Sequence, residues 1–138
     1  MAIGGGCSVS TAPVAAFSHL FNVIQVSYAS STPQLSNKLN YPLFFRTKSS
    51  DVDQNIGRIA IMKYYGWKRA ATLYQDDMYF VMVIHDMIRR MQINGIKLLA
   101  SLALSNDPFS VLKIIQETDA RIIIVHAYEN YSRVLFCE

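Results

Sequence analysis

Hydroxyl side chains are concentrated in one short segment of the sequence. Ser27, Ser30, Ser31 and Thr32 lie close together, and the small residue Ala29 among them leaves room for a ligand. Serine and threonine hydroxyls, together with exposed backbone N–H groups, are common ligands of a carboxylate. The segment therefore indicates a site for a small anion, although the same residue types also build ordinary polar turns.

Other residue types that could carry chemistry lack the spacing that chemistry requires. The three histidines show no metal-ligand pattern, and the run of glycines at 4–6 has neither the lysine of a phosphate-binding loop nor a dinucleotide fingerprint. Asp76 and Asp77 are adjacent, but they suit a helix cap better than a catalytic pair. We therefore predict no catalytic residue, no cofactor and no metal, and expect that the chain is not an enzyme.

Composition sets the broad class of the protein. The 138 residues are 51% hydrophobic and 17% charged, which is enough apolar material for the core of one domain. The net charge of +3 includes no basic run, so nucleic acid is not an expected partner. Cys7 and Cys137 stand at opposite ends of the chain, which suits neither a metal site nor a redox pair, and each could be half of a disulfide whose other half is absent.

Hydrophobic periodicity predicts strands that alternate with helices. Val14, Phe17 and Phe21 recur at helical spacing before the first of these strands. Strands are expected at 23–27, 43–46, 69–74, 96–102 and 121–125, and helices at 11–21, 51–65, 80–94, 106–115 and 130–136. This order predicts an α/β fold with parallel sheets, flanking helices and right-handed crossovers.

The loops after the strands are the candidate binding loops. In open parallel sheets, ligands bind beyond the carboxyl ends of the strands. That rule selects the loops at 28–32, 47–50, 75–78 and 126–129. The alternative is that these loops are solvated connections without a ligand.

Seven short motifs, in this order and spacing, resemble the extracellular Venus-flytrap module of metabotropic GABA type B receptors, which are class C G-protein-coupled receptors. The motifs are GCS at 6–8, SYASSTPQLS at 27–36, FFRT at 44–47, GWK at 66–68, SNDP at 105–108, DARII at 119–123 and FCE at 136–138. The resemblance implies a periplasmic-binding-protein-like type I bilobal fold, of which the chain is an incomplete part. Residues 1–47 would belong to lobe 1 and residues 48–138 to lobe 2.

The resemblance also implies a binding site. Ser8 and Ser31 match first-lobe serines that hold the transmitter carboxylate, Ala29 matches a position that lines the pocket, and Tyr128 matches a second-lobe tyrosine that closes over the ligand. Lys48 departs from the pattern, because the family has a histidine there. Either the ligand differs, or the lysine points away, or the chain belongs to a subunit that does not bind agonist.

The remaining expectations also follow from the resemblance. Cys7 and Cys137 would pair with cysteines outside this chain, and Asn130 opens a candidate N-glycosylation sequon. The implied partners are a small amino acid such as GABA, a second receptor subunit, and a G protein only through a membrane domain that this chain lacks. The implied location is the extracellular side of the plasma membrane.

Overall fold

The computed structural model describes residues 1–104 and 108–137, which divide into two compact units, Met1–Gln54 and Asn55–Glu138. The division falls a few residues after the lobe boundary expected at 47/48. Each unit contains a parallel sheet flanked by helices. The predicted α/β class with parallel sheets is therefore confirmed.

The first unit is built on a small parallel sheet with the strand order β1-β2-β3. Leu35, Phe44 and Ala15 form its buried apolar cluster. Its elements are β1 (Ala2–Ile3), α1 (Ser8–Ser18), the 3-10 turn η1 (His19–Phe21), β2 (Gln25–Ser27), the 3-10 turn η2 (Pro33–Ser36) and β3 (Phe44–Arg46).

The large apolar residues of α1 do not lie on its buried face. Val14, Phe17 and Phe21, which the periodicity singled out, are exposed, and Phe17 and Phe21 pack on one another with ring centroids 5.0 Å apart. The buried residues of the helix are small or polar instead: Thr11, Ala15 and Ser18. Small side chains let the helix lie close to the loop after β2, where Thr11 makes a hydrogen bond.

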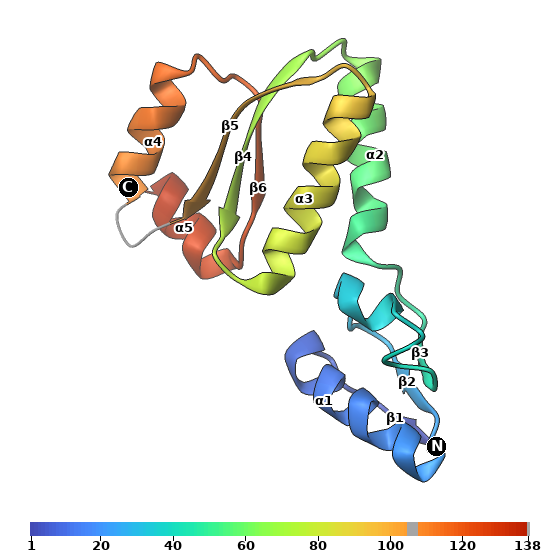
Figure 1. Ribbon diagram of the computed structural model, residues 1–138. Coiled ribbons are helices and arrows are strands. Elements are labelled where there is room, and N and C mark those ends of the chain that lie inside the picture. The colour runs from blue at the N-terminus through green and yellow to red at the C-terminus, as the bar shows by residue number, and fades with distance from the viewer. Residues whose placement is uncertain (105–107, 138) are drawn as a thin grey trace. The chain divides into compact units, whose positions relative to one another are not determined.

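The second unit has a three-stranded parallel sheet with the order β5-β4-β6, so the first strand lies in the middle. Figure 1 shows α2 and α3 on one side of this sheet and α4 and α5 on the other. The elements are α2 (Asp51–Tyr64), whose first turn belongs to the first unit, β4 (Arg69–Gln75), α3 (Met78–Ile93), β5 (Lys97–Leu104), α4 (Pro108–Glu117), β6 (Ile123–His126) and α5 (Glu129–Cys137).

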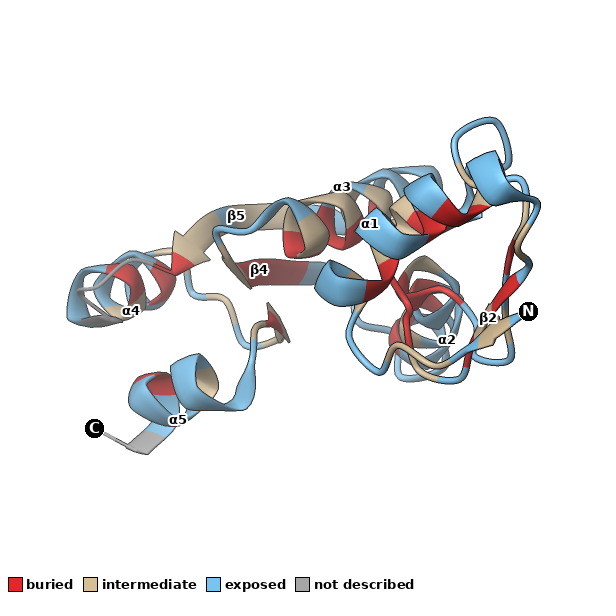
Figure 2. Cartoon of the chain, turned by 90° about the horizontal axis from the view of Figure 1, so that it is seen from below, coloured by how far each residue is buried: buried red, intermediate tan, exposed pale blue. Residues whose placement is uncertain are grey.

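Side chains of β4 alternate between two apolar clusters. Ala70 joins a cluster with Met87 of α3, whereas Leu73 joins another with Val111 of α4. The alternation arises because successive residues of a strand face opposite sides of the sheet. Figure 2 shows the buried centre of β4 as the red part of the strand.

One predicted helix start cannot be compared. The sequence predicted a helix that opens at 106–108, and residues 105–107 lie outside the described part of the chain. The helix itself is present from Pro108 to Glu117 as α4.

A buried amide connects α2 to α3. Asn55 is fully buried, and its Nδ2 donates to the carbonyl of Val83 at 2.9 Å and to Oδ2 of Asp86 at 3.0 Å. Asp86 also accepts from Nε of Arg90 at 2.6 Å and from Nη2 of Arg89 at 3.2 Å. Burial disfavours its charged form, but these hydrogen bonds outweigh burial and lower the pKa of Asp86 below its usual value.

We expect Asp86→Asn to lower the free energy of unfolding by about 1 kcal/mol at pH 7, because charge-assisted bonds are lost at a partly solvated site. A lowered pKa means that ionised Asp86 stabilises the fold above the ordinary aspartate pKa, and that this contribution disappears as the pH falls through the lowered value. The difference between variant and wild type in urea unfolding should therefore shrink as the pH falls below the ordinary aspartate pKa and through the lowered pKa of Asp86. Asp119→Asn is the control, since its ion pairs are exposed and 3.9 Å long. An equal loss in both variants would contradict the expectation.

Candidate ligand-binding site

Two of the serines in the loop after β2 serve the fold rather than a ligand. Ser27 and Ser30 are both 0% exposed, and their hydroxyls donate to the carbonyl of Gly5 at 2.7 and 3.0 Å. Ser30 also shares a hydrogen bond of 2.6 Å with Oγ1 of Thr11. The interpretation of Ser27 and Ser30 as carboxylate ligands was therefore wrong, because their hydroxyls are buried and already engaged.

Ser8 and Ser31 are brought together by the start of α1. Oγ of Ser8 accepts from the backbone N–H groups of Ser31, at 3.2 Å, and Thr32, at 3.1 Å. Within the described part of the chain, the Ser8 hydroxyl acts only as an acceptor, so its own proton remains available to donate. The half-buried Ala29 lies in the same loop, two residues before Ser31. The first unit thus places three of the predicted site residues in one loop and the helix start beside it.

A carboxylate lies directly against this pair of serines. Ser31 donates its hydroxyl to Oδ2 of Asp51 at 2.9 Å, and Asp51 is buried at the start of α2. Gln54 donates to Oδ1 of Asp51 at 2.9 Å. Acidic side chains are stabilised at a helix N-terminus by the helix dipole. The sequence analysis used Asp51 only to mark where a helix begins, and an acidic residue at a helix start beside a candidate loop was the signal that could have identified it.

Lys48 is turned toward the same carboxylate. Its Nζ lies 4.0 Å from Oδ1 of Asp51, and its side chain is 46% exposed. An ion pair of this length and exposure is weak. Lys48 and Asp51 together nevertheless leave the neighbourhood of Ser31 with nearly no net charge.

Arg46, on the neighbouring strand β3, holds the backbone of the loop after β2, which carries Ser30, Ser31 and Thr32. Its Nη1 donates to the carbonyls of Thr32 at 2.9 Å and Ser30 at 3.4 Å, and its Nη2 donates to Oγ of Ser36 at 2.6 Å. Burial lowers the pKa of Arg46, an effect that the charges of Asp53 and Asp51 partly oppose. Arg46 is a positioning residue that motif reading alone did not single out.

In the second unit, Tyr128 lies at the carboxyl edge of the sheet. It follows β6 and is 53% exposed, its ring packs edge-on against Phe80 at 5.0 Å, and its N–H donates to Oε1 of Gln75 at 3.4 Å. A shallow pocket of about 470 Å³ is lined there by Tyr128, Glu129, Asn130 and Arg133.

Asp77 caps α3 by accepting from the N–H of Tyr79 at 2.9 Å, as the sequence predicted.

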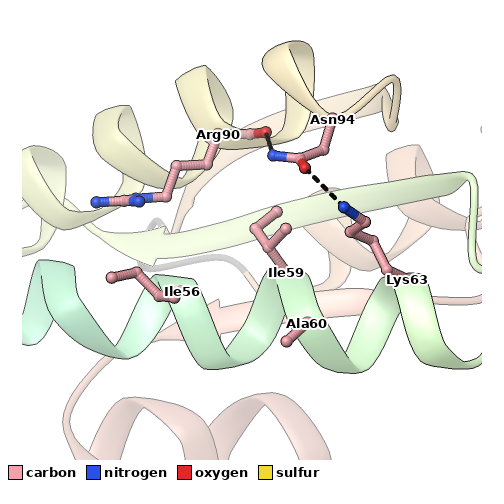
Figure 3. Close-up of a pocket in the computed structure, with 6 residues that line it drawn as sticks. All are labelled: Ile56, Ile59, Ala60, Lys63, Arg90 and Asn94. Atoms are coloured by element: carbon pink, nitrogen blue, oxygen red, sulfur yellow. Dashed lines mark hydrogen bonds between the residues drawn. The ribbon is translucent and has the colours of Figure 1, made fainter.

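A second pocket in this unit, of about 270 Å³, lies between α2 and α3 rather than at the strand ends (Figure 3). Its floor includes Ile56 and Ile59. Its polar groups bond to one another, since Lys63 donates to Oδ1 of Asn94 at 3.4 Å and Asn94 donates to the carbonyl of Arg90 at 2.8 Å. The pocket therefore offers a ligand few unpaired polar contacts.

The other predicted positions are accounted for as follows. Cys7 is exposed with a free thiol just before α1, the side chain of Cys137 lies outside the described residues, and Asn130 is exposed near the start of α5. Among the described residues, no cluster of His, Cys, Asp and Glu is arranged to hold a metal ion. No described helix combines the length and apolarity needed to cross a membrane.

Comparison with known proteins identifies close similarities along the whole chain. The model described as "Receptor family ligand binding region" matches residues 1–138. Gamma-aminobutyric acid type B receptor subunit 1 of Mus musculus is 36% identical over 133 residues, which cover 96% of this chain and 14% of that protein. Subunit 2 of Homo sapiens is 35% identical over 137 residues, or 99% of this chain and 15% of that protein.

A plant protein is also similar. Glutamate receptor 3.1 of Oryza sativa subsp. japonica is 33% identical over 144 residues, which cover 99% of this chain and 15% of the relative. The chain thus spans about one seventh of the length of the curated relatives it matches. The resemblance that the motifs indicated is confirmed by these matches.

Proposed function

Since this chain belongs to the receptor family ligand binding region, we propose that it is part of an extracellular receptor domain that binds a small amino acid, such as GABA, between two lobes. The proposal places the full protein at the plasma membrane, acting with a second receptor subunit and without catalysis. Two of the relatives are named as subunits 1 and 2 of one receptor type, which supports such a partner. The observation that carries the proposal is the contact between Ser8 and the loop at Ser31.

The carboxylate of the ligand would bind to the hydroxyls of the first unit. Ser8 has a proton to donate, and the N–H groups of Ser31 and Thr32 hold its oxygen in place. A hydrogen bond from a hydroxyl to a carboxylate contributes about 1.5–3 kcal/mol. Ser31 would donate as well once its hydroxyl leaves Asp51.

The ammonium group of the ligand would be favoured at the carboxyl edge of the second sheet. Asp76 and Asp77 follow β4, and Glu129 follows the adjacent strand β6. Arg133 lines the pocket at this edge, and it already lies 3.7 Å from Glu129. The excess of carboxylates supports attraction of a cation, and the exposed Tyr128 at the same edge would cover the ligand so that binding favours a closed state.

The test is binding of radiolabelled GABA to the full-length protein on cells. We expect Ser8→Ala to weaken binding by about tenfold to a hundredfold, because one charge-assisted hydrogen bond is lost. Ser10→Ala is the matched control, since Ser10 lies on the same helix and its exposed hydroxyl bonds only locally to the carbonyl of Cys7 among the described contacts. Equal binding by the Ser8 and Ser10 variants would remove Ser8 from the site.

The second candidate is a subunit of the same receptor class that does not bind agonist. Two features of the site at Ser8 and Ser31 favour it: Asp51 accepts a hydrogen bond from the Ser31 hydroxyl, and Lys48 replaces the histidine of the family pattern. Such a subunit would act through its partner rather than through a ligand. It is supported if the wild-type protein reaches the cell surface and binds no GABA while its partner subunit does.

A further inference from the structure

The amino edge of the second sheet carries a row of cations. Lys97 begins β5, Arg69 begins β4, and the register places these two residues beside each other. Ala71 pairs with Ile123 at the start of β6, and Arg121 precedes that strand by two residues. Asp119 lies 3.9 Å from both Arg121 and Arg69, so these two cations are also close together. Adjacent strands lie about 4.8 Å apart, so the three cations follow one another at short intervals along a line.

The row of cations does not stabilise the folded sheet. Like charges on directly opposed strand positions destabilise a sheet slightly. Asp119 lies 3.9 Å from both Arg69 and Arg121, and such exposed pairs are weak. The row is therefore poorly neutralised within the described part of the chain.

The net positive charge of the protein is concentrated at this edge. Lys63 lies in the last turn of α2 and Lys68 precedes β4, which adds two cations to the row. We call the five residues Lys63, Lys68, Arg69, Lys97 and Arg121 the basic edge. Glu117 and Asp119 are the nearby carboxylates, so the edge has an excess of three positive charges, equal to the net charge of the whole chain.

Three exposed aromatic rings adjoin the basic edge. Tyr64 is 83% exposed and packs edge-on against Tyr65 at 5.0 Å, and Tyr65 stacks on Trp67 at 5.1 Å with an angle of 20° between the rings. The backbone N–H of Trp67 donates to the carbonyl of Met62 at 2.8 Å, which holds the turn at the end of α2. Lys68 and Arg69 follow directly. In Figure 1 this region is the end of the second unit where α2 stops and β4 and β5 begin.

We propose that the basic edge and its three aromatic rings bind a sulfated polysaccharide of the cell surface. A line of cations matches the closely spaced sulfates of a linear polyanion, and flat, solvent-exposed rings offer apolar faces to sugar rings. This inference rests on the extracellular location in the proposed function. It involves the edge of the sheet opposite the carboxyl edge, so it does not compete with the amino-acid site.

The test uses purified full-length protein and a fluorescent heparin dodecasaccharide, titrated at several salt concentrations. We expect Lys97→Gln with Arg121→Gln to weaken binding about tenfold and to reduce the slope of log affinity against log salt. Lys113→Gln with Arg133→Gln removes the same charge from α4 and α5 and should weaken binding much less. Tyr64→Ala, which changes no charge, should weaken binding by a few fold if sugar rings contact the aromatic cluster.

Three results would overturn the proposal. One is an equal effect of the two double variants, which would indicate nonspecific charge attraction. Another is unchanged heparin binding in Tyr64→Ala. The third is binding to phosphatidylserine vesicles without binding to heparin, which would indicate a membrane contact instead. GABA binding measured on the wild type and on the Lys97→Gln/Arg121→Gln and Tyr64→Ala variants, whose substitutions lie away from the amino-acid site, separates this test from the proposed function, because loss of one activity leaves the other measurable.

Discussion

Gly5→Ala is expected to lower the free energy of unfolding of the first unit by about 3–5 kcal/mol, through backbone strain and a lost buried hydrogen bond. Gly5 has a φ of +89°, and an added Cβ would lie 2.2 Å from Oγ1 of Thr11. Thr11 could not remain 2.6 Å from the hydroxyl of Ser30, and the Gly5 carbonyl that accepts from Ser27 and Ser30 would shift. Thermal unfolding of the purified full-length protein, together with its yield at the cell surface, measures the effect.

Gly4→Ala separates backbone strain from steric clash. Gly4 has a φ of +132°, but nothing lies within 4 Å of an added Cβ. The variant should therefore lose only about 1–2 kcal/mol. Equal unfolding temperatures for the Gly4 and Gly5 variants would show that the hydroxyl network around Gly5 does not hold the loop. A Gly5 variant with wild-type stability would contradict the packing of Thr11 against it.

The sequence was most informative where periodicity and turn residues agree. The middle strand of the second unit was predicted at 69–74 and lies at Arg69–Gln75, and the helix predicted at 51–65 lies at Asp51–Tyr64. These elements have long apolar patterns, and Gly66, with a φ of +67°, stops the helix as expected. The strand at Ala2–Ile3 was missed, because two residues before a run of glycines carry no periodicity.

The sequence did not predict which polar side chains are buried. Serine is as compatible with a solvated turn as with a buried network, so nothing in the spacing distinguished Ser27 and Ser30 from Ser31. The distinction depends on long-range partners: the Gly5 carbonyl for the first two and Asp51 for the third. The same applies to α1, where large apolar residues predicted the packed face and Thr11, Ala15 and Ser18 occupy it.

In the proposed site, Asp51 would limit how well the hydroxyls of Ser8 and Ser31 can hold an anion. A ligand carboxylate that accepts from Ser8 and Ser31 would approach the buried Asp51 carboxylate, to which Ser31 now donates at 2.9 Å. At about 6 Å and an effective dielectric of about 20, two like charges repel by about 3 kcal/mol. Lys48, 4.0 Å from Asp51, offsets part of this repulsion. Lys48, the residue that departs from the family pattern, would therefore favour the carboxylate end of the proposed ligand.

We therefore expect Asp51→Asn to raise the affinity for GABA by about tenfold, since the variant removes a like charge and keeps an oxygen that can accept from Ser31. Lys48→Gln should act in the opposite direction and lower the affinity by a few fold, because the Asp51 charge then loses one nearby cation and keeps Arg46. Asp53→Asn is the control, since Asp53 is exposed on the same helix turn and bonds to the N–H of Ser50. A loss of affinity in Asp51→Asn would place the ammonium group of the ligand, not its carboxylate, beside Ser31. Binding that appears only in Asp51→Asn would instead identify a subunit whose hydroxyl site is held closed by its own carboxylate.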